Sequence, residues 1–395
     1  MNVYLDNNAT TMVAPEVAEA MVPFFTERYG NPSSIHSFGG RIRKEVEAAR
    51  VQVANLLGAS ADDILFTSGG SEGDNLAVLG AVQALGFRKR HIVTTRVEHP
   101  AVRGAFHYLQ KEGYRLTEIG VDREGQLDMD ALEEALTPDT ALLSVMWANN
   151  ETGVVYPIED IAAMARKRSI VFHTDAVQAA GKIPIDLRML PIDLLTISGH
   201  KLHAPKGVGA LYIRKGTKVV PQIKGGHQEG GRRAGTENVP GVVGLGVACD
   251  LAARNIEEEN DRVRVLRDRL QAGILEKCPG AVINGKNRLP NTLNVSFEYI
   301  EGESILLMMD DLGISASSGS ACTSGSLEPS HVLRAMGVPF TLANGSIRFS
   351  LSRYNTGEEI DYVLEKLPPV VERLKEISPF VNSDAKDFFW ESAPG

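Results

Sequence analysis

Short apolar segments alternate with helix-periodic segments between residues 60 and 215, and this alternation limits the possible folds more than any other feature of the chain. The short segments are rich in β-branched and aromatic residues, which is typical of buried strands. Strands are predicted at 64–67, 91–95, 141–147, 170–174, 193–198 and 209–213. Helices are predicted between several of them, at 73–85, 101–112 and 157–167. This order predicts an α/β fold with a mostly parallel sheet and helices on both faces.

A second structural unit is predicted after this region. With about 150 residues per domain, a chain of 395 residues has room for two or three domains. A charged helix at 255–276 is interpreted as a solvated connector. Two strands and two helices follow it in alternation, at 293–297, 304–312, 346–350 and 357–367. We expect a large domain (15–253), a smaller α+β domain (1–14 and 254–379) and a polar tail (380–395) that contains Phe388, Phe389 and Trp390.

Charge and hydrophobic patterning exclude several classes of protein. The formal net charge of −9 argues against a broad surface for nucleic acid or anionic membrane. The sequence has no uncharged apolar run of about 18 residues, the length that a membrane span needs. The first residues lack the basic and apolar regions of a signal peptide. The sequence therefore predicts a cytoplasmic enzyme.

The three cysteines are Cys249, Cys278 and Cys322. Their spacing gives neither a zinc motif nor a disulfide framework. Cys249 and Cys278 lie in or at the end of helix-like segments, and we expect both to be buried and inert. Cys322 lies in a run of Ser, Gly, Ala and Thr at 315–327, which predicts a mobile loop. An accessible thiol on such a loop favours a chemical role over a structural one.

A turn of small residues follows the first predicted strand. Ser68 to Gly73 lead from this strand into a helix, where backbone N–H groups and hydroxyls can bind an anion. The turn has neither the dinucleotide nor the nucleoside triphosphate pattern, so a single phosphate fits better. A plain capped turn is the alternative.

Other polar residues follow later strands, at the edge where a parallel sheet places its active site. His99 follows the second strand, Asn150 the third and Asp175 the fourth, while Lys201 follows the fifth. A buried carboxylate such as Asp175 needs a cation, and a desolvated Lys can form a Schiff base. His200 and His203 lack the glutamate of a zinc motif, so no metal site is predicted.

These features together predict pyridoxal 5′-phosphate as the cofactor. That cofactor needs a Lys for covalent attachment and an acidic partner for its ring nitrogen. Lys201, Asp175, the 68–71 turn and His99 supply the amine, the acid, the phosphate site and a planar group over the ring. Arg348, in the predicted strand 346–350, could bind a substrate carboxylate from the second unit. An ordinary surface salt bridge is the alternative for Arg348.

Several motifs in this order resemble those of NifS/IscS-type cysteine desulfurases. They are Tyr4–Thr11, Gly30–His36, Ser198–Lys201, Arg233–Asn238 and Ser317–Ser326, and the similarity extends to about Pro379. The segments 146–153 and 226–229 resemble the NifS branch most, which serves nitrogenase maturation. The resemblance implies a fold-type I pyridoxal-phosphate enzyme of the class V aminotransferase family that works as a homodimer.

The resemblance also implies a role for each residue that matches a family motif. Lys201 would hold the cofactor, His99 would stack on its ring and assist proton transfer, and Cys322 would take the sulfur. Arg348 and Asn150 would bind the substrate. The other implied cofactor contacts are Gly70, Ser71, Asn150, Asp175, Gln178, Ser198, His200 and, from the partner subunit, Thr236. Ser71 replaces the Thr of many relatives but keeps the hydroxyl.

The implied reaction converts L-cysteine to L-alanine and leaves the sulfur on Cys322 as a persulfide. An acceptor protein, such as a scaffold for iron–sulfur cluster assembly, would then receive the sulfur, and nitrogenase is the predicted destination. A selenocysteine lyase or an aminotransferase of the same fold is one alternative, although neither needs a thiol on a mobile loop. A non-catalytic metal or iron–sulfur protein is another, although three scattered cysteines do not form a cluster site.

Overall fold

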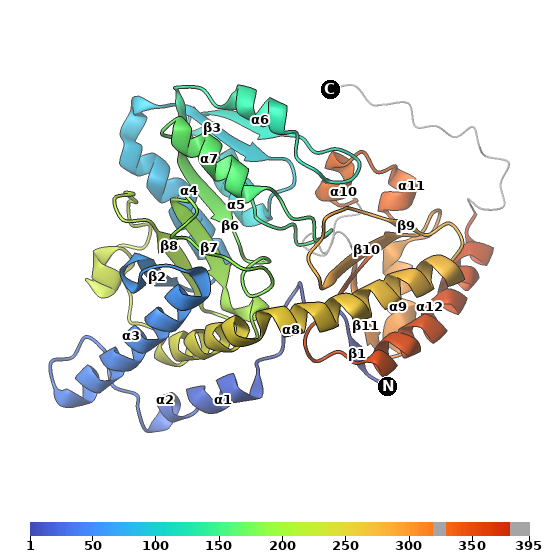
Figure 1. Cartoon of the computed structure of the whole chain (residues 1–395), viewed down its shortest axis with the longest axis horizontal. Helices are drawn as coiled ribbons and strands as arrows, with labels where there is room; N and C mark the ends of the chain where they lie inside the picture. The colour runs from blue at the N-terminus through green and yellow to red at the C-terminus, as the bar shows by residue number, and fades with distance from the viewer. Residues whose placement is uncertain (319–328, 380–395) are drawn as a thin grey trace.

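The computed structural model describes residues 1–318 and 329–379, and it contains a large sheet and a small sheet side by side (Figure 1). The large sheet has the strand order β2-β8-β7-β6-β5-β3-β4. Neighbouring strands are parallel except where β8 pairs with β2 and with β7. These strands are β2 (Ile64–Thr67), β3 (His91–Thr95), β4 (Arg115–Ile119), β5 (Thr140–Ser144), β6 (Val171–Asp175), β7 (Leu194–Ser198) and β8 (Gly209–Ile213).

The large sheet confirms the predicted α/β fold, since all six predicted strands are present with ends shifted by at most a few residues. The sequence analysis did not include β4. This strand lies at the edge of the sheet and its first four residues are exposed or half-buried, so the apolar pattern of a buried strand is missing. Val145, Met146 and Trp147, which we assigned to the third strand, lie beyond the end of β5 and are buried.

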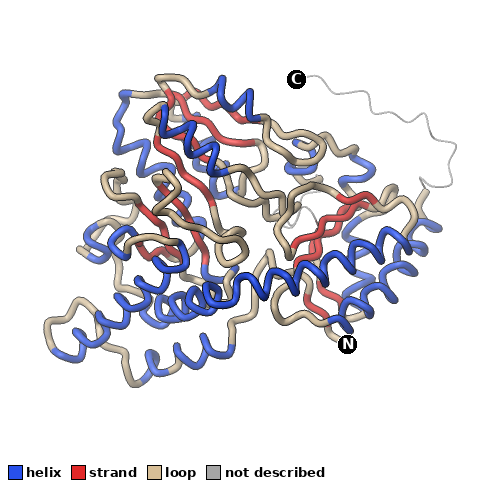
Figure 2. Tube along the Cα trace, viewed as in Figure 1, coloured by secondary structure: helices blue, strands red, loops and turns tan. Residues whose placement is uncertain are grey.

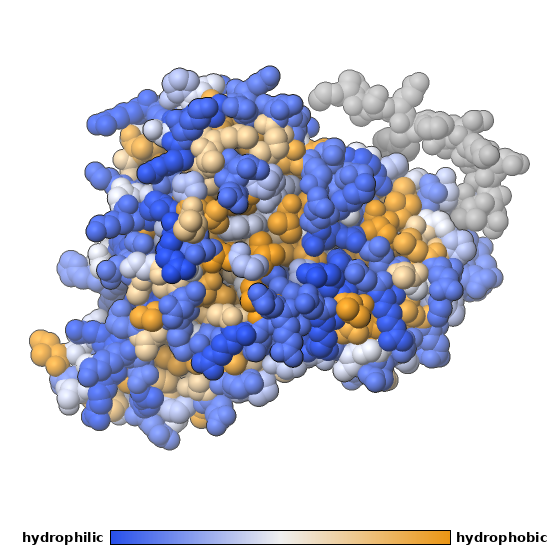
Figure 3. Space-filling model, viewed as in Figure 1, coloured by the Kyte–Doolittle hydropathy of each residue, from blue (hydrophilic) through white to orange (hydrophobic). Residues whose placement is uncertain are grey.

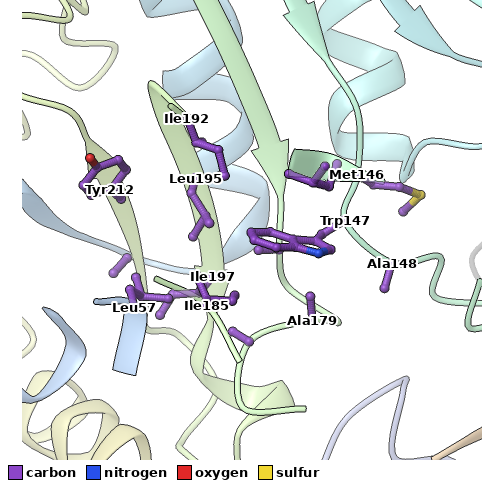
Figure 4. Close-up of a cluster of buried hydrophobic side chains, with 14 of the residues drawn as sticks. Leu57, Met146, Trp147, Ala148, Ala179, Ile185, Ile192, Leu195, Ile197 and Tyr212 are labelled. Carbon is purple, nitrogen blue, oxygen red and sulfur yellow. The ribbon is translucent and has the colours of Figure 1, made fainter. Parts of the chain in front are cut away.

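Two hydrophobic clusters cover the two faces of the large sheet. Leu65 packs with α4 and α5, whereas its neighbours Ile64 and Phe66 belong to the cluster on the opposite face, as the alternation of a strand requires. Part of that second cluster is drawn in Figure 4, where Trp147 lies beside Ala179 and Leu195. The flanking helices are α3 (Ser37–Leu57), α4 (Gly70–Leu85), α5 (Pro100–Lys111), α6 (Met129–Ala135) and α7 (Ile158–Lys167).

The small sheet has the order β12-β13-β10-β9 and is antiparallel throughout. It has its own hydrophobic core, which is shared with α9 and α12. The predicted second helix of this unit ends at 367, but α12 continues through Pro368 and Pro369 because buried Val370, Val371 and Leu374 pack on this core. The elements are β9 (Val282–Ile283), β10 (Thr292–Ser296), α9 (Gly302–Asp311), β12 (Ser317–Ser318), α10 (His331–Ala335), α11 (Phe340–Ala343), β13 (Ser346–Ser350) and α12 (Gly357–Ile377).

A single helix, α8 (Val239–Lys277), joins the two sheets (Figure 2). Its first half packs in the core of the large sheet and its second half in that of the small sheet. The connector predicted at 255–276 is part of this helix, but the prediction that it is solvated was wrong, since Val263, Leu270 and Ile274 are buried. In the described part of the chain, α8 alone is long and apolar enough to cross a membrane, and 56% of its most apolar window is buried in the fold. A buried core helix of a soluble protein meets the same criterion.

The N-terminus crosses from the small sheet to the large one. Strand β1 (Val3–Tyr4) pairs in parallel with β11 (Ile314–Ser315), and α1 (Pro15–Met21) and α2 (Pro23–Thr26) follow along α8. The segment between β1 and α1 passes over the carboxyl ends of the large-sheet strands, where Thr11 donates to the backbone oxygen of His200. The visible face of the molecule is largely hydrophilic, with apolar groups in smaller patches (Figure 3).

Candidate active site

A cavity of about 390 Å³ lies between the carboxyl edge of the large sheet and the small sheet. It brings together ten of the twelve residues predicted from the sequence. These ten are Gly70, Ser71, His99, Asn150, Asp175, Gln178, Ser198, His200, Lys201 and Arg348. All except Arg348 come from the large-sheet side, at or beyond the ends of its strands, because parallel strands place their carboxyl ends at one edge.

One end of the cavity is formed by the N-terminus of α4. Gly69 precedes the helix with φ of 149°, a conformation that favours glycine, and the helix starts three residues earlier than predicted. The free N–H groups of this first turn, with the hydroxyls of Ser71 and Ser198 nearby, suit an anion. Glu72 in the same turn is neutralised by Arg233, at 2.8 Å between Nε and Oε1. This turn can therefore bind an anion such as a phosphate.

Lys201 lies in the centre of the cavity. It belongs to a 3₁₀ turn (Gly199–Lys201) that directly follows β7. Its Nζ donates to the backbone oxygens of Asn8 and Ala9 at 2.5 and 2.6 Å. Gln178 donates to the same Asn8 oxygen at 3.0 Å. The amine thus points away from the sheet toward the N-terminal segment, where it can meet an aldehyde group.

Asp175 and His99 lie at the other side of the cavity. Asp175 ends β6, and its Oδ1 accepts a hydrogen bond from the Val177 N–H at 2.9 Å. Burial raises the pKa of Asp175, so its ionised form requires a nearby cation. His99 caps α5, with Nδ1 accepting from the Ala101 N–H at 3.2 Å, and burial lowers the pKa of its ring. In the neutral form, the His99 proton therefore resides on Nε2.

Arg348 reaches the cavity from the small sheet. It is 2% exposed and extends from β13, so the alternative of a surface salt bridge is wrong. One guanidinium nitrogen donates to the backbone oxygen of Asn150 at 2.9 Å, and another donates to Asp6 at 2.7 Å. Within the described residues, Arg348 Nε has no hydrogen-bond partner. This planar cation can bind a carboxylate between the two sheets.

His200 lies beside the anion-binding turn, where its Nδ1 is 3.2 Å from the Thr10 hydroxyl. Burial, followed by the charge of Lys201, lowers the pKa of His200 to about 4. The His200 ring is therefore neutral at physiological pH and can interact with a phosphate through a hydrogen bond but not as a cation.

Among the predicted residues that the structure describes, Thr236 does not line this cavity. Thr236 is exposed in the segment before α8. Its predicted role is to contact the cofactor of a partner subunit, and this role stays a prediction. Cys322, with most of the 315–327 segment, lies outside the described residues, as does the tail from residue 380. The other two cysteines are buried as predicted, with exposed fractions of 0% for Cys249 and 2% for Cys278.

Sequence analysis missed three functional positions in the cavity wall, Asn8, Ala9 and Asp74. Asn8 and Ala9 act through backbone oxygens, which any residue supplies, so no side-chain signal marks them. The run of polar residues at 6–8, shortly after β1, was the available signal. Asp74 lies on the inner face of α4 and is 1% exposed. The sequence pattern that could have identified it is a charged residue at a buried position of an apolar helix.

Asp74, His99 and Asp175 are also the one group within the described ranges that could converge on a metal ion, with ligand atoms within 4.8 Å of one another. They share the cavity with Lys201 and the anion-binding turn. The whole arrangement suits a ligand with an anionic group at one end, a cationic nitrogen at the other and an amine-reactive group between them.

Known proteins match this chain along nearly its whole length. The family model for aminotransferase class-V matches residues 3–363. A cysteine desulfurase from Gluconacetobacter diazotrophicus is 58% identical over 382 residues, which cover 96% of this chain and 95% of that protein. Cysteine desulfurase NifS from Azotobacter vinelandii is 56% identical, with the same coverage. A solved structure named NifS-like protein superposes with a TM-score of 0.90 at 41% identity, and the match covers 95% of this chain and all of that one. With its mostly parallel sheet, its lysine after β7 and its acid at the end of β6, the chain belongs to the class-V aminotransferase family.

Proposed function

We propose that this chain is a pyridoxal-phosphate-dependent cysteine desulfurase that converts L-cysteine to L-alanine and transfers the sulfur to Cys322. The observation that carries the proposal is the single cavity in which Lys201, Asp175, the α4 N-terminus and Arg348 meet. The relatives named cysteine desulfurase, at 56–58% identity over 96% of the chain, supply the expected reaction.

The residues present fit pyridoxal phosphate. The α4 N-terminus, Ser71 and Ser198 would hold its phosphate, Lys201 would bind its aldehyde carbon, and Asp175 would pair with its ring nitrogen. Burial raises the pKa of the Asp175 carboxyl, and a protonated ring nitrogen beside it would stabilise its ionised form. When bound, this cofactor supplies an electron sink that allows the Cα proton of an amino acid to leave.

The chain's own residues then have distinct tasks. Arg348 binds the substrate carboxylate and thereby fixes the orientation of the amino acid between the two sheets. The Lys201 amine is the base that moves the Cα proton, and the Asn8 and Ala9 oxygens hold that amine in place. His99, neutral and with its Nε2–H free of the α5 cap, would act as a proton donor in this cavity.

The proposed sulfur acceptor within the chain is Cys322. Cys249 and Cys278 are buried and burial raises the pKa of both thiols, so neither forms a thiolate readily. In the proposed step, the Cys322 thiolate attacks the substrate sulfur and the carbon–sulfur bond breaks. The products are alanine, which gains a proton at the former Cβ–S position, and a persulfide on Cys322.

The biological setting is part of the same proposal. The enzyme works in the cytoplasm as a homodimer in which Thr236 of each chain completes the phosphate site of the other. The persulfide sulfur passes to an acceptor protein for iron–sulfur cluster assembly. The 56% identity to a protein named NifS supports nitrogenase as the destination.

Simultaneous assay of alanine and sulfide tests the reaction. With L-cysteine and a thiol reductant, we expect the two products in equal amounts. Transfer of the amino group to a keto acid, without sulfide, would instead identify an aminotransferase. Turnover of selenocysteine but not of cysteine would identify a selenocysteine lyase.

The variant Cys322→Ala tests the sulfur acceptor. We expect it to bind the cofactor and L-cysteine as the wild type does but to release no sulfide. Cys249→Ala is the matched control, because it removes a buried thiol and should keep the activity. Normal turnover of Cys322→Ala with dithiothreitol would contradict the assignment of the nucleophile.

A further inference from the structure

A second buried carboxyl group lies beside Asp175. Asp74 extends from α4, and its carboxyl oxygen lies within 4.8 Å of both an Asp175 oxygen and a His99 ring nitrogen. Helix α4 lies very close to β7 at Gly73. A Cβ added to this glycine would lie 2.6 Å from the Thr196 side chain. Because α4 packs so tightly on β7, its first turns press Asp74 against the strand ends that form the site.

The basic group nearest to Asp74 cannot neutralise it. His173 Nε2 lies 3.6 Å from Asp74 Oδ1, but both ring nitrogens of His173 already contact hydroxyls. Nδ1 is 2.8 Å from Ser144 Oγ, and Nε2 is 3.0 Å from Thr196 Oγ1. Burial lowers the pKa of His173 to about 3, so this ring is neutral. Within the described part of the chain, Asp74 Oδ1 has no hydrogen-bond partner.

The charges around Asp74 also oppose its ionisation. Burial raises the pKa of Asp74, and the neighbouring Asp175 raises it further. The Thr196 hydroxyl lowers it, and Glu98 raises it again. Two carboxyl groups this close cannot both be ionised without a large energetic cost. Asp175 already has its backbone N–H donor and faces the cavity, so it carries the charge.

We propose that Asp74 is a neutral carboxylic acid in the active site and acts as a positioning residue, so that the cofactor ring nitrogen meets the single negative charge of Asp175. This role toward the ring nitrogen rests on the proposed function. An ionised Asp74 would add a second charge at the same edge and hold the ring proton more tightly. When Asp74 is neutral, the charge of Asp175 alone faces the protonated ring nitrogen.

Infrared spectroscopy of the full-length holoenzyme tests the protonation state. With ¹³C-carboxyl aspartate, the wild type should show a band of a protonated aspartic acid at neutral pH. That band should vanish in Asp74→Asn and persist in the control Asp130→Asn, which changes an exposed aspartate on α6. Absence of the band from the wild type, or its survival in Asp74→Asn, would overturn the proposal.

Rescue by the neutral isostere tests the positioning role. Asp74→Asn, which stays neutral, should keep kcat within about threefold of the wild type, whereas Asp74→Ala should lose about tenfold, the cost of one lost polar contact. Equal losses in both variants would show that the site needs a charge at Asp74, contrary to the proposal. Sulfide release by the wild type is measured in parallel. If it is absent while the infrared band responds as predicted, the proposed function fails and the neutral Asp74 stands.

Discussion

Two polar regions meet at the cavity, one through Asp74 and Asp175 and the other through Arg348, and they differ in how their charges are balanced. The strand-end region contains Asp74, Glu98 and Asp175, and the first two each have a carboxyl oxygen without a hydrogen-bond partner among the described residues. The contact region between the sheets contains Asp6, Glu151 and Arg348, where Arg348 forms an ion pair with Asp6 and Glu151 accepts from Ser330. The strand-end region has acidic groups without partners in the protein. In the contact region, the acidic groups have partners within the protein.

This difference indicates which region depends on a ligand. Buried acids without a countercharge are costly, so the strand-end region is stabilised when a cation binds. The contact region is already organised, which suits a group that must orient the substrate and not move during the reaction. Substitutions in one region can therefore be compared with substitutions in the other.

The largest effect is expected from the strand-end region, in Lys201→Ala. The variant loses both the covalent cofactor link and the base, so sulfide formation should fall by at least about 10³-fold. The rate is measured with saturating L-cysteine and added pyridoxal phosphate. Lys167→Ala, on the exposed end of α7, is the control and should keep full activity. A loss below tenfold in Lys201→Ala would remove Lys201 from the chemistry.

A smaller effect is expected from the contact region, in Arg348→Lys. Lysine keeps the charge but cannot form the planar bidentate pair, so KM for L-cysteine should rise about 10- to 100-fold with a smaller change in kcat. Steady-state kinetics separates the two constants. A fall in kcat at unchanged KM would mean that Arg348 acts on the transition state and not on substrate orientation.

The smallest effect is expected on stability, in Glu98→Gln without cofactor. Burial raises the pKa of Glu98 from 4.5 to about 8 in the folded protein. The wild type therefore loses stability as the pH rises from 4.5 through about 8, and the glutamine variant does not.

Relative to the wild type, Glu98→Gln should gain about 2 kcal/mol in free energy of unfolding between pH 6 and pH 8. Urea unfolding at the two pH values measures this gain, and Glu134→Gln on the exposed side of α6 is the control. A pH-independent difference between wild type and Glu98→Gln would show that Glu98 is already ionised in the folded state.

The strand-end region could be predicted from the sequence. Asp175, Lys201 and the turn before α4 each follow a buried strand, and the rules of parallel sheets bring such positions to one edge. Local patterns and one topological rule are enough for these positions, but not for Asp74, which lies on α4 and was missed. The buried state of Cys249 was predictable from the apolar segment around it, and that of Cys278 from its position at the end of a predicted helix.

The contacts that Arg348 and Lys201 make with distant segments could not be predicted in the same way. Arg348 meets Asp6 across 342 residues of sequence, and Lys201 meets backbone oxygens of Asn8 and Ala9. No periodic pattern encodes contacts between distant segments, or contacts that use backbone atoms. The course of α8 was mispredicted because its second half is charged on one side and apolar on the side that packs on the small core.

The central claim is that both regions together form one pyridoxal-phosphate site for L-cysteine. The most direct test is the visible absorption spectrum of the purified protein before and after L-cysteine, with sulfide assayed in the same cuvette. We predict a yellow cofactor band that shifts on addition of cysteine while sulfide is released. A colourless protein that pyridoxal phosphate cannot colour would contradict the account, because Lys201 would then have no role in the cavity.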